Sequence, residues 1–175
     1  MLTADMLRRS ATRFPDKPAI LFLSPGQRRV LLYRELHALA NQFAHALLGL
    51  GLPKGNKVAM LSRNLPEYGA VFFGTASTGL VLNNVSVLYA PDELAWVLQK
   101  SDTEVLVFDA QFADKVAAVQ AAVQAGEAVF GPRRREVIAE VFRQGKEFRR
   151  HHRADRMPPG IGIGGIAAAI AEKPG

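Results

Sequence analysis

The sequence predicts an α/β fold in which helices flank a mainly parallel β-sheet. Between residues 34 and 125, helical and strand-like patterns alternate as helix, strand, helix, strand, helix, strand and helix. That order is typical of a layer built from crossover connections between parallel strands. The 175 residues are 49% hydrophobic and 22% charged, which is the composition of a globular chain able to bury a core.

Composition and charge exclude several classes of function. The chain has no cysteine, so it has no disulfides, thiol nucleophile or cysteine metal site. We see no signal-peptide pattern and no apolar stretch long enough for a membrane span, and we therefore expect a cytoplasmic protein. Residues 1–125 hold 12 Lys/Arg and 10 Asp/Glu, a difference of +2, whereas residues 126–175 hold 10 and 6, a difference of +4. The basic character is thus concentrated at the C-terminal end.

The first 33 residues predict a short helix followed by a β-hairpin. Residues 4–13 have the periodicity of an amphipathic helix, and Pro15 ends it because proline cannot continue a helix. Two strand-like runs, 19–23 and 29–33, lie on either side of a turn at 24–27 that contains proline and glycine.

The strongest helix signal covers residues 34–51, where Gly49 and Gly51 predict the end of the helix. Seven apolar residues recur at the spacing of a single helix face, which predicts that this face is buried. They are Leu36, Leu39, Ala40, Phe43, Ala44, Leu47 and Leu48.

A polar loop, Ser62-Arg63-Asn64, follows a strand predicted at 57–62. Open α/β sheets often bind ligands at the carboxyl ends of their strands, so this loop is a candidate binding site. The alternative is a connection to a helix predicted over about 66–78. In that interpretation Asn64 is the N-cap, and Pro66 and Glu67 lie in the first turn. We favour the connection.

The rest of the alternation is predicted as strands at 81–85 and 104–108 and helices at 91–99 and 111–125. Beyond it, residues 136–148 predict a basic amphipathic helix, a type of segment that binds nucleic acid or anionic membranes. Because this segment lacks interleaved aromatic residues and any recognisable reading motif, we do not expect specific nucleic-acid binding.

Two glycine-containing segments have the letters of phosphate-binding loops. GIGIGG at 160–165 matches G-x-G-x-x-G, but it follows a Pro-Pro pair instead of a strand, and we favour a flexible segment. GTASTG at 74–79 has hydroxyl and glycine residues, but no lysine follows until Lys100 and the segment continues a helical pattern. We therefore interpret its small residues as allowing close packing against a strand.

The histidines do not form a predicted metal site. His37 and His45 are eight residues apart, two helical turns, and this spacing does not bring them together on one ion. His151 and His152 lie among arginines, where we favour a solvated surface over anion binding. No carboxylate pair or Ser-His-Asp arrangement can be assigned from the sequence.

Three segments in natural order resemble the N-terminal region of the AMP-forming acyl-CoA synthetases, members of the adenylate-forming superfamily. They are FPDKPAI, LLYRELHALANQFAHALLGLGLPKGNKVAMLSRNLPEY and GLVLNNVSVLYAPDELAWVLQKSDTEVLVFD. The resemblance covers about residues 5–120. Two positions differ from the family pattern. Asn56 stands where the family commonly has an aspartate, and Ser62-Arg63 stands where the family often has apolar residues before the asparagine.

The resemblance implies an ATP-dependent, magnesium-assisted reaction. A carboxylic acid forms an acyl-adenylate, and a thiol, usually coenzyme A, then displaces AMP. The family's phosphate loop, ribose-binding acid and catalytic lysine lie further along its sequence, and we find none of them here. We therefore predict no catalytic, cofactor-binding or metal-binding residue in this chain and no cofactor bound to it.

The resemblance predicts a truncated synthetase, inactive alone, with an incomplete α/β region at 1–125. Residues 126–175 form a divergent basic tail, disordered or derived from a shifted reading frame. A separately encoded remainder of the enzyme, or self-association, would supply a partner. The alternative is a non-catalytic interaction module whose basic tail binds another protein, nucleic acid or an anionic membrane. The acyl substrate and the oligomeric state cannot be predicted.

Overall fold

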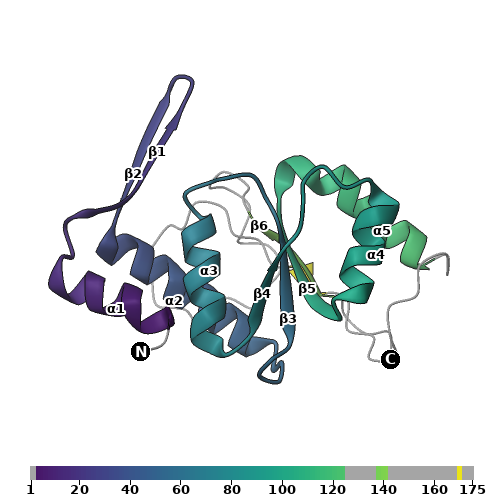
Figure 1. Cartoon of the computed structure of the whole chain (residues 1–175), viewed down its shortest axis with the longest axis horizontal. Coiled ribbons are helices and arrows are strands. Elements are labelled where there is room, and N and C mark those ends of the chain that lie inside the picture. The colour runs from purple at the N-terminus through teal and green to yellow at the C-terminus, as the bar shows by residue number, and fades with distance from the viewer. Residues whose placement is uncertain (1–2, 125–136, 142–168, 171–175) are drawn as a thin grey trace. The chain divides into compact units, whose positions relative to one another are not determined.

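The structure is a computed structural model that describes residues 3–124, 137–141 and 169–170 (Figure 1). The chain divides into two compact units. The first comprises Met1–Val58 and Arg63–Leu82, and the second comprises Ala59–Ser62 and Asn83–Gly175. Each unit has its own cluster of buried apolar residues.

The first unit combines three helices with a two-stranded hairpin. Its elements are α1 (Thr3–Arg13), β1 (Pro18–Ser24), β2 (Gln27–Leu32), α2 (Tyr33–Gly49) and α3 (Tyr68–Thr78). β1 and β2 pair antiparallel, which confirms the predicted hairpin. Gly26 has a φ of +72° in the turn between them, where a glycine costs no steric strain. Figure 1 shows the hairpin extending away from α1 and α2.

Helix α2 buries most of its predicted apolar face in the first unit. The buried members are Leu36, Ala40, Phe43, Ala44 and Leu47. Leu39 is partly buried, and Leu48 is exposed, so its predicted place in the core is wrong. The helix begins at Tyr33 because the Glu35 carboxylate accepts a hydrogen bond from the Leu32 amide at 2.9 Å, satisfying a free N–H at the helix start.

The sheet has the strand order β4-β3-β5-β6-β7. The strands are β3 (Lys57–Leu61), β4 (Val81–Asn84), β5 (Thr103–Asp109), β6 (Val137–Val141) and β7 (Ala169–Ile170). β3 and β4 run parallel, since the Val81 amide donates to Asn56 and the Val85 amide donates to Met60. β5 and β6 are also parallel, whereas β6 and β7 are antiparallel. The predicted fold class is confirmed.

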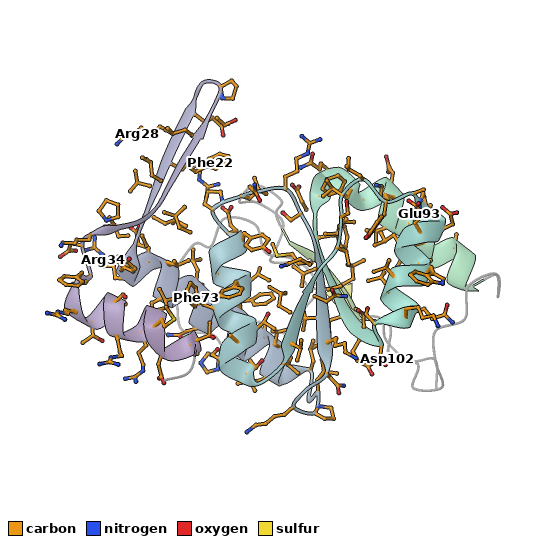
Figure 2. The ribbon with its side chains drawn as sticks, in the orientation of Figure 1. Phe22, Arg28, Arg34, Phe73, Glu93 and Asp102 are labelled. Carbon is orange, nitrogen blue, oxygen red and sulfur yellow. The ribbon has the colours of Figure 1, made fainter. Side chains whose placement is uncertain are left out.

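The second unit packs α4 (Pro91–Lys100) and α5 (Ala113–Gln124) together beside β5 (Figure 1). A short 3₁₀ helix, η1 (Ala110–Phe112), precedes α5. Glu93, labelled in Figure 2, accepts a hydrogen bond from the Ala90 amide at 2.8 Å and so satisfies the start of α4. The core of this unit consists of Ala59, Leu61, Val85, Leu94, Ala95, Leu98, Leu106, Phe108, Val116 and Val119.

One predicted helix is wrong. Residues 137–141, which lie within the helix expected at 136–148, form strand β6 and extend the sheet beside β5. Strand pairing of this segment with β5 overrides its helical periodicity. Within the described part of the chain, no helix has the length and apolar character needed to cross a membrane.

Candidate functional site

The polar loop after β3 connects to helix α3 through a turn. Helix α3 begins at Tyr68, and its N-cap residue is Glu67, which makes no side-chain capping hydrogen bond. The Tyr68 amide donates to the Leu65 carbonyl at 3.0 Å, and Pro66 is almost fully buried within that turn. Asn64 is exposed four residues before the helix. The predicted N-cap role of Asn64 and the predicted helical position of Pro66 are therefore wrong.

The Glu67 side chain makes a contact within the fold, an ion pair that has a structural role. Its carboxylate forms an ion pair with Arg29 of β2, which ties the hairpin to the start of α3 within the first unit. The next residue, Tyr68, is partly buried, and this burial raises the pKa of its phenol. The phenol therefore stays neutral near pH 7 and supplies no anionic nucleophile.

The GTASTG segment is helical, as predicted, and two of its three hydroxyl groups bond within the helix, whereas the buried Thr75 hydroxyl has no hydrogen-bond partner among the described residues. Ser77 Oγ donates to the Gly74 carbonyl at 2.7 Å, and Thr78 Oγ1 donates to the Thr75 carbonyl at 2.8 Å. Gly79 ends the helix in the left-handed conformation with a φ of +80°. These internal bonds compete with any bond to a phosphate.

The close packing expected at Gly74 is present, but its partner is a helix and not a strand. A Cβ at Gly74 would lie 2.7 Å from the Ala40 carbonyl oxygen and 3.0 Å from Phe43 Cδ1. Both residues belong to α2 in the first unit. The absence of a side chain at Gly74 thus permits α3 to approach the backbone of α2.

The two histidines of α2 have different surroundings. His37 lies 3.4 Å from the Asn41 amide nitrogen, one helical turn away, and His45 is exposed. In the ranges that the structure describes, no group of three or more His, Asp or Glu residues is arranged to hold a metal ion. The candidates at 151–152 and 160–165 lie outside the described residues.

Two sets of polar contacts that the sequence did not reveal lie in the second unit. Asp109, the last residue of β5, is buried, and its carboxylate accepts hydrogen bonds from the backbone and side-chain nitrogens of Gln111. Lys115 of α5 donates to the carbonyl of Val87 at 2.7 Å and to that of Tyr89 at 2.5 Å. The Asp109 bonds hold the 3₁₀ helix and the Lys115 bonds hold the β4–α4 loop, so both sets of contacts have a structural role.

The backbone contacts of Lys115 have no signal in the sequence, because its acceptors are carbonyl oxygens 26 and 28 residues away. The local sequence indicates only one neighbour of the Lys115 side chain, Phe112, which lies one helical turn earlier. The ammonium nitrogen lies 5.9 Å from the centre of that ring, within the range of a cation–π contact.

Replacing Lys115 with methionine should lower the free energy of unfolding by about 2 kcal/mol, because two carbonyls lose a charged donor. Hydrogen exchange should also accelerate at the amides of residues 85–90. The matched control is Lys100→Met on the exposed end of α4, which should leave both quantities unchanged. Equal effects of the two substitutions would show that Lys115 does not hold the loop.

A family model described as AMP-binding enzyme matches residues 7–158, most of the chain. The chain belongs to this family. The range matched by the family model continues beyond residue 125. The domain boundary at 125 and the origin of residues 126–175 stay predictions.

Curated relatives of the chain are fatty-acid–CoA ligases. It is 37% identical over 110 residues to the long-chain-fatty-acid–CoA ligase of Escherichia coli O6:H1, and this match covers 62% of the chain and 19% of the relative. It is 33% identical over 116 residues to long-chain-fatty-acid–CoA ligase FadD13 of Mycobacterium tuberculosis, and this match covers 66% of the chain and 23% of FadD13. The chain therefore spans about a fifth of the length of these relatives.

The fold comparison agrees with the sequence comparison. The solved N-terminal domain of FACL13 from Mycobacterium tuberculosis superposes with a TM-score of 0.64 at 25% identity. The superposition covers 81% of this chain and 41% of that domain. The resemblance to acyl-CoA synthetases is confirmed, and the chain corresponds to part of an N-terminal domain. The prediction that it carries no site residue of its own stays a prediction.

Proposed function

We propose that this chain is the N-terminal scaffold portion of a fatty-acid–CoA ligase and has no ligase activity by itself. The proposal rests on how little of a complete ligase this chain covers. The chain matches the long-chain-fatty-acid–CoA ligase of Escherichia coli O6:H1 over 110 residues, and this match covers only 19% of that ligase. The described residues support it. Asp109, at the end of β5, and Lys115, on α5, are engaged in hydrogen bonds within the second unit.

In the proposed whole enzyme, a fatty-acid carboxylate attacks the α-phosphorus of ATP and pyrophosphate leaves. The thiolate of coenzyme A then attacks the acyl carbonyl, and AMP leaves as the thioester forms. Magnesium would balance the phosphate charge. We assign the binding of ATP, magnesium and coenzyme A to parts of the enzyme outside this chain. The contribution of this chain is a packed helix and sheet layer that supports those parts.

Pyrophosphate release tests this proposal. With ATP, magnesium, coenzyme A and fatty acids of several lengths, the purified chain should release no pyrophosphate above the rate measured without fatty acid. The complete Escherichia coli ligase is the positive control. Leu94→Ala, a change in the buried core, serves as the variant control for contamination.

Acid-dependent release by the chain would contradict the proposal if Leu94→Ala reduces it in proportion to the loss of folded protein. Release that persists unchanged under conditions where the variant has lost folded protein comes from a contaminating enzyme and leaves the pure chain inactive, as proposed.

A further inference from the structure

The β1–β2 hairpin has two different faces. In an antiparallel pair, directly opposite residues share a face and alternate residues along each strand return to it. Leu21 pairs with Val30 and Leu23 pairs with Arg28, so these four side chains share one face. We call Leu21, Leu23 and Val30 the outer trio. Figure 2 shows Arg28 and Phe22 on opposite sides of the hairpin, in agreement with this register.

The opposite face already has partners within the first unit. Ile20 packs with the buried cluster formed by α1, α2 and α3, and its Cδ1 atom lies 2.9 Å from the position of a Cβ on Gly69. Arg29 on the same face is ion-paired with Glu67. These contacts fix the orientation of the hairpin, so the outer trio points away from the helices of its own unit.

The outer trio is exposed although all three of its members are large and apolar. The exposed fractions are 54% for Leu21, 67% for Leu23 and 37% for Val30. A strand with one solvated face normally places polar residues on that face. A two-stranded hairpin is also only marginally stable in water without a further layer. The face therefore has the character of a surface that another segment covers.

We propose that the outer trio is a docking surface for the part of an AMP-binding enzyme that this chain lacks. This proposal rests on the proposed function. The hairpin lies inside the range matched by the family model, and the chain covers only 41% of the solved N-terminal domain to which it is similar. Most of that domain is therefore additional chain, available to cover an apolar face. Arg28, exposed beside Leu23, suits a carboxylate at the rim of the contact.

Co-expression with a defined probe tests the proposal. The probe is the Escherichia coli O6:H1 ligase from which the 110 residues matched by this chain, and any preceding them, have been removed. The tagged full chain should copurify with the probe. The triple variant L21T/L23T/V30T keeps residues compatible with a strand but loses apolar contact, and it should reduce the copurified probe at least about tenfold. Leu88→Thr, at another exposed leucine, should not reduce it.

Circular dichroism and a melting curve of the isolated triple variant should match those of the unmodified chain, because the replaced side chains are exposed there. Equal copurification by the triple variant and the unmodified chain would overturn the proposal, as would no copurification by the unmodified chain. A dimer of the unmodified chain that the triple variant abolishes would assign the surface to a second copy and also overturn it. None of these outcomes depends on pyrophosphate release, so failure of the proposed function is detected separately.

Discussion

Replacing Leu94 with alanine should lower the free energy of unfolding of the second unit by about 3 kcal/mol. The Leu94 side chain is 0% exposed and belongs to a core cluster that includes residues of β3, β5 and both helices of this unit. Truncation removes apolar contacts and leaves a cavity that this close-packed surrounding can fill only in part. The expected loss is a large fraction of the stability of a small domain.

Urea unfolding measured by tryptophan fluorescence tests the prediction. Trp96 is the only tryptophan in the sequence and lies on α4, two residues from Leu94, so its fluorescence reports on this unit. The control is Leu88→Ala, because Leu88 is 88% exposed and its truncation should change the free energy of unfolding by less than about 0.5 kcal/mol. Similar losses for the two leucines would show that Leu94 is not in a packed core.

Most elements between residues 3 and 124 could be predicted because their signals are local. The strand predicted at 104–108 is observed as Thr103–Asp109, since its apolar run has clear ends. The helix predicted at 91–99 is observed as Pro91–Lys100, with Pro91 and Glu93 marking its start. Proline, glycine and capping carboxylates act within a few residues, so the sequence displays their effects directly.

The segment 137–141 was predicted incorrectly because two patterns coincide there. Val137, Ile138 and Val141 fit one face of a helix, but they are also β-branched residues that favour strands. The partner strand β5 pairs Val105 with Val137, a contact between residues 32 positions apart in the sequence. Such a distant partner leaves no periodicity in the segment itself.

The polar groups of the candidate site could be predicted only in part. Asp109 directly follows the strand predicted at 104–108, but the sequence does not show that Gln111 donates hydrogen bonds to its carboxylate. Asn64 has the residue type of an N-cap, yet Pro66 is buried in a turn that the Tyr68 amide closes on the Leu65 carbonyl, and the helix begins only at Tyr68. In both cases side-chain packing, which sequence patterns do not encode locally, decides which polar group is used.

Replacing Gly74 with valine should lower the free energy of unfolding of the first unit by about 3 kcal/mol. A Cβ at this position would lie 2.7 Å from the Ala40 carbonyl oxygen, a distance at which one of the two helices must shift. Because the obstructing atom belongs to the backbone of α2, no side-chain rotation relieves the contact. The two γ-methyl groups of valine add further overlap near Phe43, so α2 and α3 should separate and expose their apolar faces to water.

Helical circular dichroism during urea unfolding, combined with limited proteolysis to locate cleavage within the first unit, measures this loss. The matched control is Gly49→Ala at the end of α2, where the space around a Cβ is open and φ is not positive. That change should be neutral or slightly stabilising, since alanine restricts the unfolded chain more than glycine does. If Gly74→Val melts like Gly49→Ala, then the close contact between α2 and α3 does not exist in solution. A loss at Gly74 alone would show that glycine is required at position 74 for helix packing, independently of any phosphate.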